Sequence, residues 1–255
     1  MVRGSWAEVK GGGLDGRQSP PYSLGMSMLR TAAAALSLAL VPAPGSTAQE
    51  PKTAGKIGYY VDSRRFNTVC LELSSSNLPW GLSLWGFTDF NSAQHDAHRR
   101  FDPAGHLSRY DVSKELEPGW VRGFRGLGLQ AEYFDMTGPR NAVLRLGPTF
   151  RHGLPALGGR AGWLVWRVFP IETDGTGGLV GLVLFVPLAA RLHLDGFFDY
   201  HVNKDGPGRV VTEPQLNFKV NDHLSAVVEF RYDGFVDAVP GLDGFGVAPG
   251  LHLAF

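Results

Sequence analysis

Three pairs of residues in this chain have the types and spacing of hydrolase components. Asp199 and His201 are two positions apart, as in the Asp–His pairs that some barrel proteases hold at their mouth. Ser108 and Ser225 each follow a histidine by two positions, a spacing that could place a base beside a hydroxyl nucleophile. A protease of the first kind also needs a second acidic pair to orient the water, and no Asp-x-Asp sequence occurs. We therefore expect no catalytic residues. If the chain forms a β-barrel, as argued below, a hydrolase with its site at the extracellular mouth of that barrel stays an alternative.

Metal and cofactor chemistry has weaker support. His95 and His98 lie in the segment 91–107 with a spacing that can bind a metal ion, but histidines in loops usually have no such role. Cys70 is the single cysteine, which excludes an internal disulfide framework and a multi-cysteine zinc site. No glycine-rich phosphate loop of the Walker type is present. We expect neither a metal site nor a cofactor, and we expect that the protein is not an enzyme.

Most charged residues instead follow one face of short, regularly alternating segments. Between 224 and 232, apolar residues alternate with polar ones, which is the period of a β-strand. In a closed barrel such polar faces line a wet interior, and interleaved acids and bases there suit a neutral polar solute. Buried charges need partners, so many of them should form ion pairs across the barrel. The predicted channel-lining residues are Tyr60, Trp85, Phe87, Asp89, Glu132, Arg145, Arg167, Arg191, Asp195, Phe197, Glu213, Glu229 and Arg231.

The elements that must position these side chains are strands. No segment has a sustained apolar helical period, and the 34 glycines favour turns and strands over a helical bundle. Twelve strands are expected, or ten if the first hairpin does not form. Their ranges are 56–61, 65–74, 81–90, 108–116, 124–135, 141–151, 161–170, 178–187, 191–201, 209–219, 223–235 and 244–255.

Three features favour a membrane barrel over a secreted β-sandwich. Short turns alternate with longer connections, as in outer-membrane barrels. The chain ends with apolar residues at 251, 253 and 255, the last of them aromatic. Aromatic residues also fall at strand ends, in two girdles that flank an aliphatic band. The predicted fold class is therefore an all-β, transmembrane, antiparallel up-and-down barrel. The girdle residues are Phe90, Tyr110, Tyr133, Tyr200, Tyr232 and Phe245 at the long-loop end, and Phe150, Phe218 and Phe255 at the short-turn end.

Two segments fit this pattern poorly. Residues 179–186 are apolar on both faces, and residues 162–170 offer only Arg167 as a polar inward candidate. We interpret them as a part of the lumen covered by a loop or by the N-terminal segment. The alternative is an apolar stripe in the channel that stacks a flat ring.

The N-terminal region has the layout of an export signal. Residues 31–41 form an apolar stretch of eleven residues after Arg30, and small residues at 46–48 suit cleavage. We predict an upstream artefact or disordered extension at 1–25, a signal peptide at 26–48 and an outer-membrane barrel at 49–255. The expected location is the outer membrane of a Gram-negative-type bacterium.

Charge and composition limit the partners. Lys plus Arg and Asp plus Glu both number 24, so the chain lacks the basic excess of a nucleic-acid binder. Its charge is too low and its aromatic content too high for a disordered chain. The expected partners are outer-membrane lipid and a small polar solute, with no nucleic acid, and the barrel is expected to be a monomer.

Four short motifs resemble a known family. They are Trp80-Gly81 with Gly86-Phe87-Thr88-Asp89-Phe90, Leu146-Gly147-Pro148-Thr149-Phe150, Asp195-Gly196-Phe197-Phe198-Asp199-Tyr200, and Thr212-Glu213-Pro214-Gln215-Leu216-Asn217-Phe218. In order and spacing they are similar to the nucleoside-specific channel-forming outer-membrane proteins, the Tsx-like family, over roughly residues 57–255. The resemblance implies a twelve-stranded monomeric barrel that passes nucleosides by diffusion. The family's nucleoside-contacting residues cannot be matched position by position.

The predicted function is an outer-membrane diffusion channel for nucleosides or similar small polar solutes. Two alternatives stay open, which are the barrel hydrolase and a closed, ion-paired barrel with a structural or adhesive role.

Overall fold

The structure, a computed structural model, describes residues 50–94, 105–116, 126–136, 142–157, 160–173, 177–204, 206–234 and 243–255. They belong to the unit Pro42–Phe255. The predicted upstream segment 1–25 and signal peptide 26–48 lie outside these ranges, as do most of the segment 91–107 and its His95 and His98. Within the described ranges, no helix is long and apolar enough to span a membrane.

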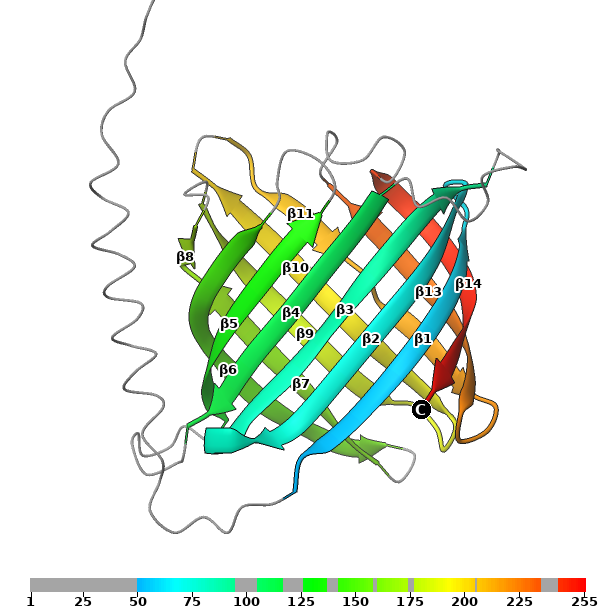
Figure 1. Ribbon diagram of the computed structural model, residues 1–255, viewed down its shortest axis with the longest axis horizontal. Helices are drawn as coiled ribbons and strands as arrows, with labels where there is room; N and C mark the ends of the chain where they lie inside the picture. The colour runs from blue at the N-terminus through cyan, green and yellow to red at the C-terminus, as the bar shows by residue number, and fades with distance from the viewer. Residues whose placement is uncertain are drawn as a thin grey trace, which may run out of the picture. The chain divides into compact units, whose positions relative to one another are not determined.

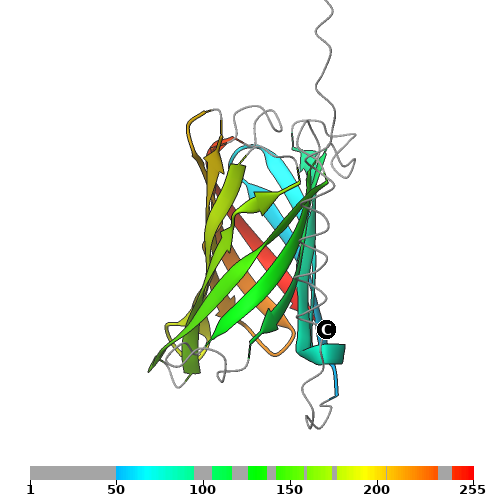
Figure 2. The same cartoon turned by 90° about the vertical axis from the view of Figure 1, so that its left-hand side faces the viewer.

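The described residues form a closed antiparallel β-barrel (Figures 1 and 2). Its strands are β1 (Lys52–Asp62), β2 (Phe66–Leu78), β3 (Leu82–Ala93), β4 (Gly105–Glu115), β5 (Leu127–Met136), β6 (Val143–Leu157), β7 (Arg160–Phe169), β8 (Ile171–Glu172), β9 (Gly177–Pro187), β10 (Leu192–Asn203), β11 (Arg209–Thr212), β12 (Gln215–Lys219), β13 (Leu224–Asp233) and β14 (Gly244–Ala254). One 3-10 turn, η1 (Pro79–Gly81), joins β2 to β3.

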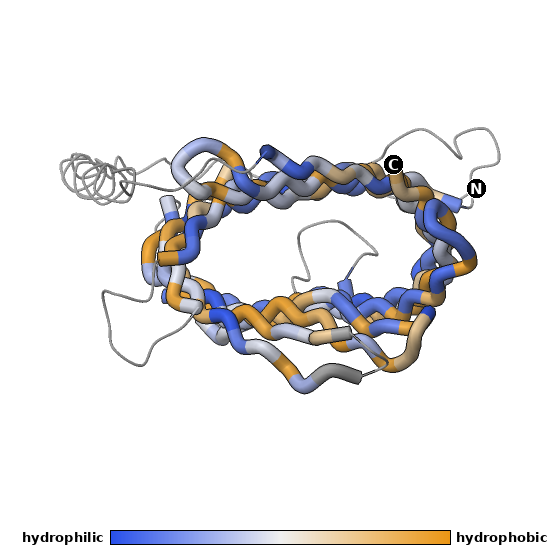
Figure 3. The backbone as a smooth tube through the Cα atoms, turned by 90° about the horizontal axis from the view of Figure 1, so that it is seen from below, coloured by the Kyte–Doolittle hydropathy of each residue, from blue (hydrophilic) through white to orange (hydrophobic). Residues whose placement is uncertain are grey.

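These segments occupy twelve positions around the wall, which confirms the predicted count. β8 continues β7, since both pair with β6. β11 and β12 are two parts of one position between β10 and β13. The wall closes because β14 pairs with β1 and β9 pairs with β10. The uncertain first hairpin is present, with β1 and β2 paired from Lys52–Ser76 to Asp62–Phe66. Seen along its axis, the wall is an oval ring (Figure 3).

Alternation along each strand gives the barrel an apolar outside and a polar inside. On β1, Ile57, Tyr59 and Val61 are exposed on the outer surface, whereas Tyr60 and Asp62 are buried inside. The same division runs through the other strands, so the exposed outer residues are mostly large and apolar. Such an outward band is the lipid-facing surface of a transmembrane barrel.

Eight of the nine predicted girdle residues are exposed, and Phe150 is half-buried. Tyr110 lies in the middle of β4 and not at its end, so it does not belong to an end girdle. The exposed residues are Phe90, Tyr110, Tyr133, Tyr200, Tyr232, Phe245, Phe218 and Phe255.

The turn after β12 shows why the connections at that end can be short. Asn221 Oδ1 accepts hydrogen bonds from the backbone N–H groups of His223 (2.9 Å) and Leu224 (2.8 Å). An asparagine that bonds the backbone ahead of it stabilises a tight turn without help from other elements. This end of the barrel, which also holds η1 and the chain's C-terminus, is called the turn end below (Figure 1).

The structure corrects two details of the predicted strands. The strand expected at 209–219 is interrupted at Glu213 and Pro214, because proline has no N–H group to donate to the ladder. Arg191 was predicted to lie on a strand and face the lumen, but β10 begins only at Leu192. Arg191 therefore lies in the exposed turn between β9 and β10, where alternation does not determine direction.

Candidate functional site

The lumen contains a cavity of about 450 Å³, lined by residues from near the turn end, such as Trp163, and from nearer the other end, such as Tyr60 and Arg231. A second cavity of about 40 Å³ adjoins it. Of the predicted channel-lining residues, Glu132 and Arg145 line only the smaller cavity and Arg191 lines neither. The remaining predicted residues line the larger one, and they are Tyr60, Trp85, Phe87, Asp89, Arg167, Asp195, Phe197, Glu213, Glu229 and Arg231.

Three arginines and their carboxylate partners fill the middle of the lumen. Arg109 on β4 approaches Glu132 on β5, with Nη2 2.5 Å from Oε2. Arg145 on β6 donates to Glu132 Oε1 (2.5 Å) and, from Nε, to Glu172 Oε2 (2.9 Å). These side chains are almost fully buried, and buried charges persist only when they are paired. This group, together with Asp111, Arg167 and Asp199, is called the arginine cluster below.

Asp199 on β10 joins this cluster to the opposite wall. Its Oδ2 accepts a hydrogen bond from Arg109 Nη1 (3.0 Å), and its Oδ1 accepts one from Arg167 Nη2 (2.5 Å). Gly181 on β9 lies between Arg167 and Asp199 in the same row of paired residues. A Cβ atom at Gly181 would meet Asp199 Oδ1 and both Nε and Nη2 of Arg167. The absence of a side chain at Gly181 therefore lets this ion pair pass over β9.

A second network, around Arg231 on β13, fills another part of the inner wall. Arg231 donates to Glu229 Oε2 from Nε (2.9 Å) and Nη2 (2.6 Å), and to Thr68 Oγ1 from Nη1 (2.9 Å). Its guanidinium carbon lies 4.9 Å from the ring centre of Tyr60. The Tyr60 hydroxyl forms a 2.5 Å hydrogen bond with Nε2 of His252. Each of these polar groups has a partner within the wall.

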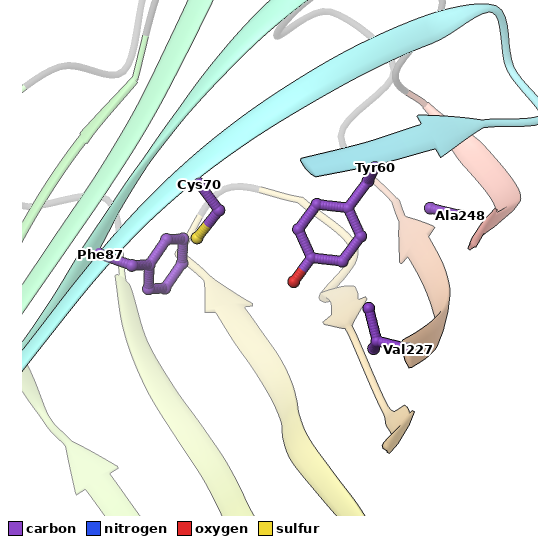
Figure 4. Close-up of a cluster of buried hydrophobic side chains, with 5 residues drawn as sticks. All are labelled: Tyr60, Cys70, Phe87, Val227 and Ala248. Atoms are coloured by element: carbon purple, nitrogen blue, oxygen red, sulfur yellow. The ribbon is translucent and has the colours of Figure 1, made fainter. Parts of the chain in front are cut away.

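A small apolar cluster lies beside this network on the inner faces of neighbouring strands (Figure 4). Its members are Tyr60, Cys70, Phe87, Val227 and Ala248. The single cysteine is thus a buried packing residue next to Phe87.

Flat side chains follow one another near the turn end, and three of them, Arg151, Trp163 and Phe185, line the larger cavity. The rings of Trp163 on β7 and Phe185 on β9 are stacked, with centroids 6.1 Å apart and planes at 22°. The Arg151 guanidinium lies 5.1 Å from the centre of the Trp163 ring, and the His193 ring lies 5.2 Å from that of Phe185. These four residues are called the stacking strip below.

The channel-lining residues predicted from the sequence include no member of the stacking strip. Alternation along the strands could have identified two of its members as facing the lumen, because Arg151 shares a strand face with Arg145 and Trp163 shares one with Arg167. The segments that fitted poorly, 162–170 and 179–186, contribute Trp163, Val165, Val183 and Phe185 to the cavity wall.

The alternative hydrolase site has an unsuitable arrangement. Asp199 and His201 are both buried inside the lumen rather than at the mouth. Both carboxylate oxygens of Asp199 accept hydrogen bonds from arginines, so this carboxylate is already committed to charge pairing. Ser108 shares its hydroxyl bond with Thr88 (3.0 Å) on the outer surface. Among the described residues, no group of three or more His, Cys, Asp or Glu side chains is arranged to hold a metal ion.

Comparison with known proteins shows which solved structures share this fold. No protein-family model matches the chain, and no curated protein matches it. Among solved structures, the KdgM porin matches with a TM-score of 0.51 at 10% identity, over 79% of this chain and 99% of that one. The KdgM porin in complex with disordered oligogalacturonate matches with a TM-score of 0.50 at 11% identity, with the same coverage. At this identity the likeness concerns the fold alone, and the chain has the barrel architecture of outer-membrane porins.

Proposed function

We propose that this protein is a porin-like channel of the outer membrane that admits small polar solutes, with nucleoside-like molecules as its preferred class. The observation that carries the proposal is the cavity of about 450 Å³ inside a barrel with a lipid-facing surface. The fold it shares with the KdgM porin agrees with this role. We further propose that the protein is exported by the signal peptide at 26–48 and acts as a monomer.

Charge in the cavity wall favours a neutral solute over an ion. Acids and bases alternate around it, as in the pairs Lys56–Glu72 (2.8 Å) and Arg231–Glu229 (2.6 Å). The lining has six acidic and five basic residues, so the two signs nearly balance and neither cations nor anions gain a strong advantage. Hydrogen-bonding groups nevertheless remain available to a solute with many donors and acceptors.

The stacking strip supports the preference for a molecule with a flat ring. Trp163 and Phe185 are only half buried and face the cavity. Stacking of a base on an aromatic side chain contributes about 1–3 kcal/mol in nucleic-acid-binding proteins. A nucleoside combines such a ring with a polar sugar, and both parts find matching groups in this wall.

Nucleoside block of the ion current through single barrels in a planar bilayer tests this proposal. Trp163→Ala removes the central ring of the strip, and Trp166→Ala is the matched control because Trp166 lies on the same strand but faces lipid. We expect adenosine to block the wild type and Trp166→Ala at similar concentrations, and Trp163→Ala only at much higher ones. Equal block of all three would contradict the preference for a stacked ring.

A closed barrel with a structural role is the second candidate. The ion pairs that cross the lumen at the arginine cluster favour it. A folded wild-type barrel that never conducts would support this role.

A further inference from the structure

A small set of side chains lies at the boundary between the two cavities. Phe87, Arg109, Phe197 and Glu213 each line both the larger and the smaller cavity. They come from β3, from β4, from β10 and from the break between β11 and β12. These four residues, called the partition below, therefore separate the two cavities.

Arg109 is the member of the partition that links opposite walls. Its Nη1 donates to Asp199 Oδ2 at 3.0 Å, and its guanidinium carbon lies 5.4 Å from the centre of the Phe197 ring. Around the wall, β5, β6, β7 and β9 separate β4 from β10 on the shorter side. The contact consequently crosses the lumen instead of following the wall. A solute that moves from one cavity to the other must pass this guanidinium.

The surrounding charges allow Arg109 to leave Asp199 without leaving either group unpaired. Glu132 lies 2.5 Å from Nη2 of Arg109 and Asp111 lies 3.5 Å from its Nε, both on the Arg109 side of the lumen. Asp199 keeps Arg167, whose Nη2 is 2.5 Å from Oδ1. In the structure Arg109 contacts all three carboxylates at once. Since an uncompensated buried charge is the costly outcome, a second arrangement with Arg109 held only against its own wall would keep both groups paired.

We propose that Arg109 is the gate of this channel, closing the lumen when it bridges β4 to β10 and opening it when it retracts toward Glu132 and Asp111. This inference rests on the proposed channel function. The gate limits the size of the solutes that pass, and the stacking strip nearer the turn end selects among those that fit.

Single-channel conductance of refolded barrels tests the gate. Arg109→Gln removes the long charged group, and Asp199→Asn weakens its anchor on β10 while leaving Arg109 in place. Arg64→Gln is the control, because Arg64 is an ion-paired arginine (Nη2 2.7 Å from Asp62 Oδ2) that lines neither cavity. We expect both gate variants to raise the mean conductance several-fold and Arg64→Gln to match the wild type. Folding of every variant is checked by heat-modifiable migration in gels.

The outcomes separate the gate from the channel function. A conducting wild type with unchanged Arg109→Gln and Asp199→Asn would overturn the gate and leave the channel intact. A silent wild type with conducting gate variants would support the gate and contradict free diffusion through the native barrel. Silence of all four folded proteins would overturn both.

Discussion

Substitution of Gly181 by alanine should disturb the arginine cluster through a single methyl group. A Cβ atom at Gly181 would lie 3.0 Å from both Nε and Nη2 of Arg167 and closer still to Asp199 Oδ1. These are side-chain ends, but both are nearly fully buried and each is held by other ion pairs. They cannot simply turn away into solvent. Because overpacking a filled interior typically destabilises a protein, we expect Gly181→Ala to lower the free energy of unfolding by about 1–3 kcal/mol.

Gly153→Ala on β6 is the matched control. A Cβ atom there has nothing within 4 Å, and Gly153 is exposed. Restricting the unfolded chain then makes the change neutral or stabilising, by about 0.4–1 kcal/mol. Urea unfolding in lipid vesicles, followed by tryptophan fluorescence, measures both variants.

A double-mutant cycle with Asp199→Ala identifies the mechanism. Once the carboxylate is removed, the added methyl group meets only Arg167, so the loss caused by Gly181→Ala should shrink. Equal stability of Gly181→Ala and Gly153→Ala would refute the reasoning, as would a Gly181→Ala loss that does not change in the Asp199→Ala background.

Three further predictions, two of them with a control substitution, test the wall of the barrel. Leu71 lies in the middle of β2 and is 46% exposed, so Leu71→Arg should lower the free energy of unfolding by about 2–4 kcal/mol if that surface faces lipid. Leu188 lies in a turn and is also 46% exposed, and Leu188→Arg should lower it by about 0–1 kcal/mol in the same urea assay. Tyr60→Phe removes the hydroxyl that is hydrogen-bonded to His252 and should lower the free energy of unfolding by about 1–3 kcal/mol. Tyr59→Phe, on the outer face, should not change it measurably. Equal effects of the two substitutions would contradict a stabilising role for the inner hydrogen bond. Phe255→Ala should lower the unfolding midpoint, because the terminal ring packs over Gly55, and an unchanged midpoint would show that this contact contributes nothing.

The strands could be predicted because lipid and lumen impose opposite demands on successive residues. The expected strand at 223–235 corresponds to β13 (Leu224–Asp233), where Phe230 is exposed and its neighbours Glu229 and Arg231 are buried. Alternation fails where a strand ends. For this reason Arg191, one position before β10, was assigned to the lumen although it lies in a turn.

Partners across the lumen could not be read from alternation. Arg109 and Asp199 are 90 positions apart, and their contact depends on the barrel's cross-section and on a glycine at 181. The stacking strip likewise requires the register that sets Trp163 opposite Phe185. The resemblance to nucleoside channels stays a prediction, since the structural comparison reaches only the porin-like fold.

Liposome swelling with the refolded wild-type protein tests the central claim most directly. Adenosine and thymidine are compared with sugars of similar mass, at equal osmotic strength and equal protein per lipid. We expect swelling with every solute, and faster swelling with the nucleosides than with the sugars. No swelling from protein shown to be folded would contradict the channel, and equal rates would contradict its preference for nucleosides.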